Sequence, residues 1–316
     1  MAYPGLDPSL EPVVEEIREL MKVPPDEMGH VPYREMMAAR SAALPKKRPE
    51  SLQVSDHALD TPYGTVGIRA YRPEAADGGA LVYMHGGGWI MGDLNSHDGV
   101  CVDLALQSGL TVFALDYGLA PENPYPVALN QCHWVFHHLR ENAGKWQIDA
   151  DRIAIGGDSA GGNLALAVCL KTRGEAGALP CAQLLIYPCV SPDLESPSYE
   201  KHANAPFLDK RGMVWIWNTY LAKSEDWQDP LALPALESCY AGLPPTVVFT
   251  AEIDPLASEG AALAQRFVAE DVPVFYFEAK GLIHGLLRFR ERSPASARAF
   301  TRMVNGLTML MGYSRP

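Results

Sequence analysis

From Ala80 onward, short apolar runs alternate with stretches of helical spacing, and this alternation restricts the fold more than any other feature. The apolar runs have the uninterrupted hydrophobicity of strands that are buried on both faces. They span Ala80–Met84, Thr111–Leu115, Arg152–Ile155, Gln183–Tyr187, Thr246–Thr250 and Pro273–Phe277. The predicted helices span Val100–Gln107, Val127–Arg140, Leu164–Arg173, Ala257–Glu270 and Ala295–Met311. This order predicts an α/β fold, in which helices flank a mostly parallel sheet.

Two further strands are predicted upstream of Ala80. Leu52–Asp56 and Val66–Tyr71 flank a turn that contains Pro62 and Gly64, which is typical of an antiparallel pair. With this pair the expected sheet has eight strands. A chain of 316 residues with 47% hydrophobic residues is long enough to bury one large core.

Two segments stand outside the alternation of strands and helices. Near the N-terminus, Val13–Met21 and Tyr33–Leu44 have helical spacing, with Pro24-Pro25 between them and Pro45 after them. We interpret this part as a small helical appendage. Residues 191–229 contain several prolines and an aromatic stretch, and we expect them to form an excursion over the carboxyl edge of the sheet.

Composition excludes several classes of function. The formal net charge of -12 and the absence of a cluster of Lys and Arg argue against a nucleic-acid partner. The N-terminus lacks the pattern of a signal peptide, and no apolar run approaches the length of a membrane span, so we expect a cytoplasmic protein. The six cysteines are scattered without a Cys-x-x-Cys pair, which indicates free thiols and no metal site.

The first chemical motif lies where a predicted strand meets a predicted helix. Gly157-Asp158-Ser159-Ala160-Gly161 directly follows the strand that begins at Arg152, and small and apolar residues follow it. A nucleophile elbow turns so sharply that the residues two before and two after the Ser must lack side chains. The context therefore favours Ser159 as a catalytic nucleophile over a Ser in an ordinary glycine turn.

A glycine-rich loop follows the strand Ala80–Met84. It reads His85-Gly86-Gly87-Gly88-Trp89, and glycines let backbone N–H groups approach a developing oxyanion closely. Loops of this kind act together with the N–H of the residue after the nucleophile, here Ala160. The loop matches neither Gly-x-Gly-x-x-Gly nor Gly-x-x-x-x-Gly-Lys, which argues against a phosphate-binding turn.

Chain order selects the partners of Ser159. In α/β hydrolases the acid follows the nucleophile and the His comes last, and only His202 and His284 lie beyond Ser159. Asp254 and His284 each lie just past a predicted strand, and a right-handed crossover makes those two strands parallel. We therefore expect Asp254 and His284 at the same sheet edge and prefer Asp254 to Glu252, because Pro255 fixes the backbone beside it.

These motifs, in this order, resemble those of the hormone-sensitive-lipase-like esterases, the bacterial family IV of lipolytic enzymes. The resemblance covers about Leu81 to His284. It implies an α/β-hydrolase fold in which a helical cap, residues 1–45, and a second cap segment, residues 191–229, cover the catalytic domain of residues 46–316. It also implies hydrolysis of short- to medium-chain carboxylic esters through an acyl-enzyme, without a cofactor or metal.

The resemblance also assigns roles to individual residues. Ser159, Asp254 and His284 are expected as the triad, and the N–H groups of Gly87, Gly88 and Ala160 as the oxyanion hole. Two positions depart from the family pattern: Gly118 stands where Arg is usual, and Leu286 replaces an aromatic residue after His284-Gly285.

Some questions stay open at the level of sequence. Trp89 and Phe207 are expected to line the substrate pocket. His97 and Asp98 fit equally well a brace of the glycine loop by hydrogen bonds and an exposed helix start. The same triad would serve an amidase or peptidase, and receptors on this fold bind small molecules, although retention of His284 argues against a receptor. By analogy with the family we expect a homodimer that pairs through the last strand.

Overall fold

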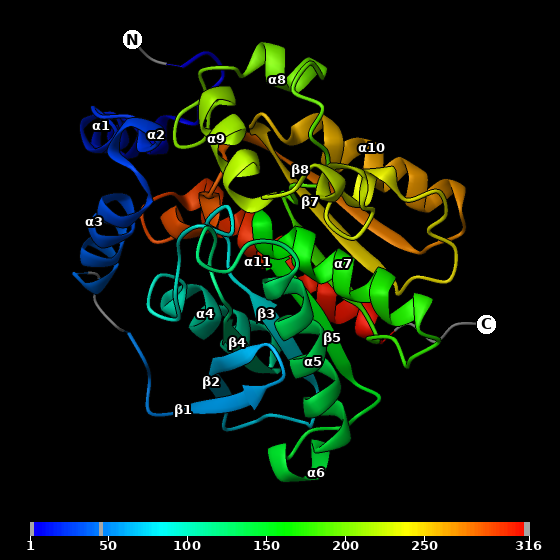
Figure 1. Ribbon diagram of the computed structural model, residues 1–316. Coiled ribbons are helices and arrows are strands. Elements are labelled where there is room, and N and C mark those ends of the chain that lie inside the picture. Colours follow the sequence, from blue (N-terminus) through cyan, green and yellow to red (C-terminus); the bar gives the residue numbers. More distant parts are fainter. Residues whose placement is uncertain (1–2, 44–46, 313–316) are drawn as a thin grey trace.

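The computed structural model describes residues 3–43 and 47–312 (Figure 1). Its centre is one eight-stranded sheet with the strand order β1-β2-β4-β3-β5-β6-β7-β8. The strands are β1 (Leu52–Thr61), β2 (Gly64–Pro73), β3 (Ala80–Met84), β4 (Thr111–Asp116), β5 (Ile153–Asp158), β6 (Gln183–Ile186), β7 (Thr246–Ile253) and β8 (Val274–Ile283). The predicted domain boundary at residues 45 and 46 and the predicted helix end at Leu44 and Pro45 lie outside the described residues.

The strand directions follow the prediction from the sequence. β1 and β2 form an antiparallel hairpin, and β2 pairs antiparallel with β4. All remaining pairs, from β3 with β4 to β7 with β8, are parallel. The eight-stranded, mostly parallel α/β sheet is thus confirmed, and the carboxyl ends of β3, β5, β7 and β8 meet at one edge.

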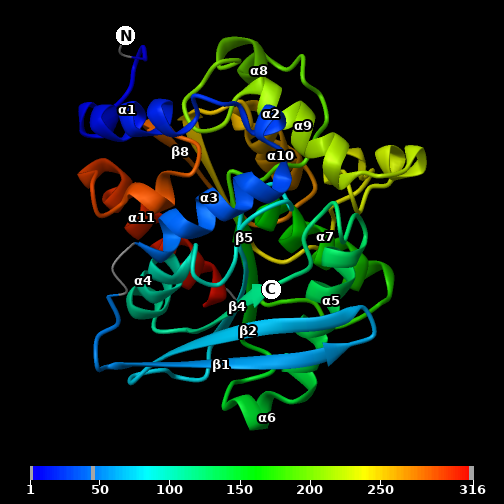
Figure 2. The same cartoon turned by 60° about the vertical axis from the view of Figure 1, so that its left-hand side comes forward.

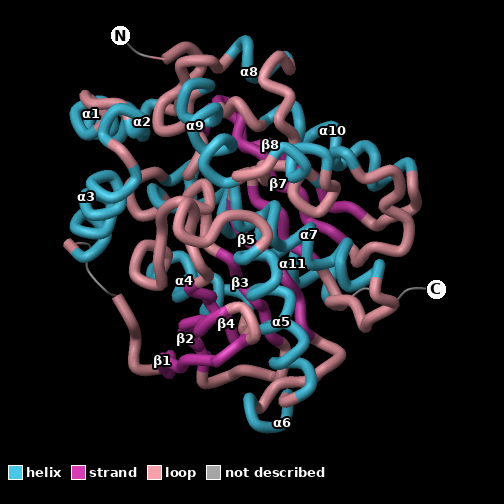
Figure 3. Tube along the Cα trace, in the orientation of Figure 1, coloured by secondary structure: helices cyan, strands magenta, loops and turns pink. Residues whose placement is uncertain are grey.

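Helices cover both faces of the sheet (Figures 1 and 3). Helices α5 (Val127–Glu141), α7 (Ala160–Gly174) and α10 (Ala257–Ala269) enclose one buried apolar cluster against the sheet. Helices α4 (Asp98–Ser108) and α11 (Pro294–Met311) enclose the second cluster on the opposite face. The short helix α6 (Ala143–Trp146) follows α5. None of the helices in the described ranges has the length and apolarity that a membrane span requires.

Several strands run further than the sequence predicted, and three of these extensions, in β5, β7 and β8, lead to the site residues. β5 continues through Gly156, Gly157 and Asp158, because its ladder with β6 persists to that residue. β7 and β8 stay paired as far as Ile253 and Ile283, across an irregularity between Ala251 and Ile253. These extensions contain polar residues and glycines, so hydrophobicity did not predict them as parts of strands. Ser159, Asp254 and His284 consequently follow their strands with no intervening loop.

The two segments outside the alternation are largely helical. The N-terminal one holds α1 (Glu11–Leu20), α2 (Pro25–Met28) and α3 (His30–Ala42), and residues 191–229 hold α8 (Pro197–Lys201) and α9 (Lys210–Tyr220). Pro25 opens the one-turn helix α2, since proline suits the first helical position. Figures 1 and 2 both show α2 close to α9, although about 180 residues separate them in sequence.

Candidate active site

Ser159 lies at a strained turn between β5 and α7. Its backbone has φ 56° and ψ −119°, which is rare for a residue with a side chain. A Cβ at Gly157 would lie 2.3 Å from the Met84 carbonyl oxygen, and one at Gly161 would lie 2.0 Å from the same oxygen. The two glycines are therefore required by close approach of the backbone, and the turn presents the Ser159 hydroxyl at the carboxyl edge.

His284 and Asp254 lie beside Ser159. His284 Nε2 is 3.0 Å from Ser159 Oγ, and its Nδ1 is 2.7 Å from Asp254 Oδ2. The other carboxylate oxygen of Asp254 accepts from the N–H of Leu256 at 2.8 Å. Because Asp254 is fully buried and held at both oxygens, it fixes the plane of the imidazole. The parallel pairing of β7 and β8 brings these residues together, as the crossover argument predicts.

The rival residues from the sequence bind elsewhere. Glu252 accepts from the N–H of Gly281 at 2.8 Å. His202 contacts the hydroxyl of Tyr3 through Nδ1. Each of these side chains is thus committed to a structural contact away from Ser159.

The glycine loop faces the elbow. Gly87 and Gly88 have φ angles of 128° and 61°, and a Cβ at Gly87 would lie 2.1 Å from the Met91 carbonyl oxygen. Within residues 3–43 and 47–312, the N–H groups of Gly87, Gly88 and Ala160 have no hydrogen-bond acceptor. Buried N–H groups are normally paired, so three unpaired ones beside Ser159 suit an incoming oxyanion.

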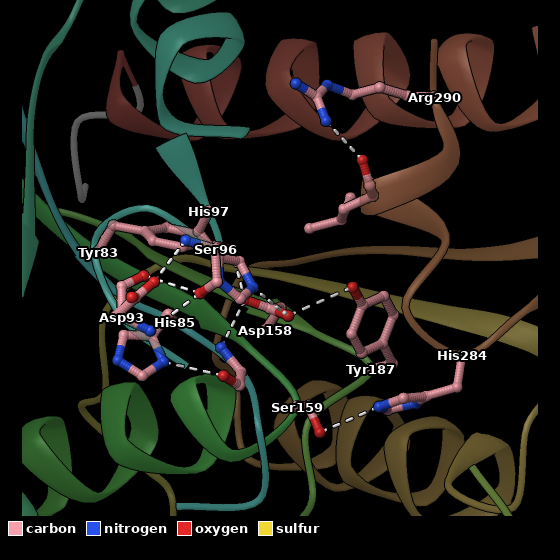
Figure 4. Close-up of polar contacts among 12 residues, drawn as sticks. Tyr83, His85, Asp93, Ser96, His97, Asp158, Ser159, Tyr187, His284 and Arg290 are labelled. Atoms are coloured by element: carbon pink, nitrogen blue, oxygen red, sulfur yellow. Dashed lines mark hydrogen bonds and ion pairs between the residues drawn. The ribbon is translucent and has the colours of Figure 1, made fainter. Parts of the chain in front are cut away.

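A second buried carboxylate, missed by the sequence reasoning, links this loop to the elbow (Figure 4). Asp158 Oδ1 accepts from the Tyr83 hydroxyl at 2.6 Å and from the N–H of Gly86 at 2.9 Å. His97 Nε2 lies 3.4 Å from the carboxylate. Burial alone would raise the pKa of Asp158, but His97 and these hydrogen bonds lower it well below its usual range. The charged carboxylate therefore ties the glycine loop to the residue beside the nucleophile.

His97 thus reaches the glycine loop through Asp158, and its ring also stacks on that of His85, the first residue of the loop, at 5.6 Å between centroids. Asp98, considered beside it as a second brace, belongs to another cluster. It accepts from Arg69 at 3.1 Å and from the Tyr71 hydroxyl at 2.8 Å, and it also pairs with Arg48. Its contacts join α4 to β2, away from the loop.

His85, the first residue of the loop, is held neutral. Burial lowers the pKa of its imidazole to about 4, and the neighbouring His97 adds to that effect. Its ring stacks on Tyr117 at 4.4 Å between centroids, and its Nδ1 lies 2.9 Å from the Gly86 carbonyl oxygen. A neutral ring with Nδ1 as the donor accounts for both contacts.

A cavity of about 360 Å³ opens above Ser159 and His284. Phe207 lines it and stacks on the His284 ring at 6.5 Å, as expected for a substrate-contacting residue. Trp89 does not line it. The Trp89 ring is fully buried and stacks on Tyr220 at 4.0 Å, and its backbone has a positive φ of 56°. The structure therefore contradicts the prediction that Trp89 binds substrate.

Both helical segments outside the alternation contribute to the cavity wall. Tyr33 comes from α3, whereas Trp215 and Ile216 come from α9. The Trp215 ring meets Tyr33 edge-on at 6.0 Å, which joins the two segments over the cavity.

An arginine from outside the segment that contains Gly118 contacts that segment. Arg34 of α3 donates to the carbonyl oxygens of Ile90 and Ala120 and makes two bonds with Glu122 at 2.9 and 2.7 Å. An arginine from the N-terminal part of the chain thus supports both this segment and the glycine loop. Leu286, the second departure, is fully buried.

Other candidate chemistry is absent from the described part of the chain. All six cysteines are free, four of them buried. In residues 3–43 and 47–312, no three His, Cys, Asp or Glu side chains form a group that could hold a metal ion.

Comparison with known proteins agrees with this geometry. Residues 81–288 match the family model described as alpha/beta hydrolase fold. Esterase LipI of Mycobacterium tuberculosis is 33% identical over 98% of this chain and 99% of its own length. An ethyl acetate hydrolase of Pseudomonas putida is 35% identical over 81% of this chain and 82% of its own.

Solved structures agree as well. An ester hydrolase from the metagenome of Lake Arreo superimposes with a TM-score of 0.91 at 32% identity, and the match covers 98% of this chain and 100% of that one. A thermostable esterase from Pseudomonas putida ECU1011 gives a TM-score of 0.92 at 27% identity over 99% and 100% of the two chains. This chain accordingly belongs to the hormone-sensitive-lipase-like carboxylic ester hydrolases of the α/β-hydrolase superfamily.

Proposed function

We propose that the protein hydrolyses carboxylic esters through an acyl-enzyme on Ser159, with His284 as general base and Asp254 as the acid that orients it. The observation that carries this proposal is the unbroken chain of contacts from Asp254 Oδ2 through His284 to Ser159 Oγ, at 2.7 and 3.0 Å. All three side chains are buried, so water competes little for these contacts.

In the first half of the reaction, Ser159 Oγ attacks the ester carbonyl while its proton passes to His284 Nε2. Asp254 stabilises the imidazolium that forms, and His284 then gives the proton to the departing alcohol. In the second half, water attacks the acyl-enzyme, His284 takes the proton of that water, and Ser159 recovers it as the acid leaves. Bonds and protons balance over the cycle without a cofactor.

The tetrahedral intermediates carry a negative oxygen. The N–H groups of Gly87, Gly88 and Ala160 would donate to it, and each such donor is worth roughly 10²–10³ in rate. Ala160 is also the first residue of α7, so the positive end of that helix dipole acts on the same oxygen.

The cavity gives the proposal its substrate range. Tyr33, Phe207, Trp215 and Ile216 present mainly apolar surface around an open cavity of about 360 Å³, which suits short- to medium-chain esters. Residues 3–43 and 191–229 would act as the cap of this site. The cytoplasmic location and the homodimer stay predictions; β8 is an edge strand of the sheet and would supply the pairing surface.

A serine-directed experiment tests the function. A fluorophosphonate should label the protein, and Ser159→Ala should abolish both labelling and turnover of p-nitrophenyl butanoate, a loss of roughly 10⁶-fold in kcat. The circular dichroism spectrum and melting temperature should persist. Residual turnover near the wild-type rate in Ser159→Ala would refute the assignment of the nucleophile.

Ester and amide chemistry are separated by matched substrates. The wild-type protein is expected to prefer an aryl ester to the anilide of the same acid in kcat/KM. A preference for the anilide would replace the ester hydrolase by an amidase that uses the same three residues.

A further inference from the structure

Arg288 lies at the active site but has no part in the chemistry proposed above. It belongs to the 3-10 helix Leu286–Phe289, four residues after His284. Its half-buried side chain lines the cavity that holds Ser159 and His284. It also lines a second cavity, of about 210 Å³, behind Gly86 and Gly87 of the glycine loop.

The other charged side chains around the main cavity already have partners. Arg18 pairs with Glu15, and Arg211 pairs with Asp26 and Glu27 at 2.8 Å. The two acidic residues of the wall are Asp158, which accepts from Tyr83 and Gly86 as described, and Asp209.

Asp209 is also occupied, because its carboxylate accepts from the N–H of Gly212 at 2.6 Å and so caps α9. Arg288 differs from these residues. Across residues 3–43 and 47–312, its guanidinium has neither a carboxylate within 4.0 Å nor a hydrogen-bond acceptor. A planar group with five donors is thus left unpaired in a partly desolvated wall.

The charge of Arg288 affects the pKa of two nearby tyrosines. Burial raises the pKa of Tyr33 to about 12, and the guanidinium of Arg288 opposes that rise. Burial also raises the pKa of Tyr187, and Arg288 again opposes the effect. Tyr33 comes from α3, whereas the Tyr187 ring lies 4.5 Å from the His284 ring. The charge therefore acts across the cavity, between the N-terminal helices and the general base.

We propose that Arg288 binds a carboxylate carried by the substrate, so that the preferred substrates are esters with a second, negatively charged group. This inference rests on the proposed function and names the substrate class of that site. A guanidinium matches a carboxylate with two parallel hydrogen bonds, and such charge-assisted bonds are about twice as strong as neutral ones. The protein as a whole carries a net charge of -12, so this unpaired cation offers anions a local attraction that the surrounding surface does not.

The test compares charged esters with neutral ones of the same shape. Monoethyl adipate and its amide counterpart place the charge on the acyl side, and 4-acetoxybutanoate and its amide place it on the alcohol side. For each pair, the ratio of kcat/KM for the acid to kcat/KM for the amide is measured at pH 7.5. Because the ratio is internal to each protein, a general loss of activity or stability leaves it unchanged.

In the wild-type protein, at least one pair should give a ratio of about ten or more, and added NaCl should reduce it. Arg288→Gln should lower that ratio by at least about tenfold, which equals about 1.4 kcal/mol, and Arg288→Lys should restore part of it. Arg292→Gln is the matched control: it removes the same charge four residues further on, from a residue paired with Glu16 outside the cavity wall.

Ratios near one for both pairs, or equal ratios in wild type and Arg288→Gln, would overturn the role of Arg288 while Ser159-dependent hydrolysis persisted. If Arg292→Gln lowered the ratio as much as Arg288→Gln does, the preference for acids would come from the net charge of the protein. That result would also overturn the role of Arg288. Failure of the proposed function would give a different result: Ser159→Ala would still hydrolyse all of these esters.

Discussion

The active-site cavity is bounded by two regions that are built in different ways. The first is the sheet edge, the carboxyl ends of β3, β5, β7 and β8, where Ser159, Asp254 and His284 are buried and held by strand pairing. The second is the helical cover, residues 3–43 and 191–229, which supplies side chains such as Tyr33 and Trp215.

The forces that hold these regions differ as well. Buried hydrogen bonds and continuous ladders fix the sheet edge. The two parts of the cover meet through the edge-on contact of Tyr33 with Trp215 and through ion pairs such as that of Arg211 with Glu27, in which both side chains are exposed. Exposed pairs of this kind typically contribute about 0–1 kcal/mol. On the proposed function, this difference places the reaction chemistry at the sheet edge and the fit of the acyl chain at the helical cover, while Arg288, which follows β8, is proposed to select charged substrates.

If the sheet edge sets the chemistry, the largest effect should come from Asp254. Asp254→Asn keeps the size of the side chain but places an amide where the Nδ1 proton of His284 needs a carboxylate, so kcat should fall by roughly 10⁴ with a small change in KM. Stopped-flow or steady-state assays on p-nitrophenyl butanoate measure this loss. Glu252→Gln, which alters a carboxylate bonded to Gly281 instead, is the control. Retention of most of the wild-type kcat by Asp254→Asn would contradict the assignment.

A smaller loss is expected from Asp158, which positions the glycine loop without touching substrate. Asp158→Asn removes the negative charge of the group to which Gly86 and Tyr83 both donate through Oδ1, so kcat should fall by about 10² while KM changes much less. A purely structural role would lower the melting temperature and leave kcat per folded molecule intact. Tyr83→Phe removes one donor and keeps the carboxylate, and it should have the milder effect on kcat.

The contribution of the sheet edge to stability should also depend on pH. The pKa of His85 is about 4 in the folded protein and 6.5 when unperturbed, so the unfolded chain binds this proton more readily. The contribution of neutral His85 to the free energy of unfolding is complete above pH 6.5 and declines as the pH falls toward 4. Between pH 7.5 and pH 5 the wild type should lose about 2 kcal/mol more unfolding free energy than His85→Gln, measured with urea. Equal losses would show that His85 does not resist protonation.

Sequence reasoning succeeded where position along the chain determines position in space. Gly157 and Gly161 were predicted from the sharpness of the turn, and the structure shows that a Cβ at either would collide with Met84. Asp254 and His284 were predicted to meet because consecutive parallel strands deliver their ends to one edge. The ends of β7 and β8 were misplaced, since ladder hydrogen bonds continue through polar residues that carry no apolar signal.

The same reasoning failed where contacts depend on distant segments. Trp89 follows the glycine loop directly, but nothing in the sequence specifies its positive φ or the stacking of its ring on Tyr220. Arg34 supports the glycine loop from more than fifty residues away, and Arg288 can be identified as unpaired only once every neighbouring carboxylate has been placed. Most of these failures concern the helical cover, whose packing has no strand register to guide it.

The smallest effect is expected in the cover itself. Trp215→Ala should widen the cavity beneath α9 while Ser159, Asp254 and His284 stay in place. Each additional buried methylene contributes about 0.8 kcal/mol, so the kcat/KM ratio of p-nitrophenyl octanoate to p-nitrophenyl acetate should rise by up to about tenfold. Turnover of the acetate should change little. Trp134→Ala truncates a tryptophan of α5 that stacks on His138, outside the wall of this cavity, and it should leave the ratio unchanged. An unchanged ratio in Trp215→Ala would mean that this part of the cover does not set the acyl length. A loss of acetate turnover comparable to that of Asp158→Asn would mean that the cover takes part in the chemistry and that the two regions are not independent.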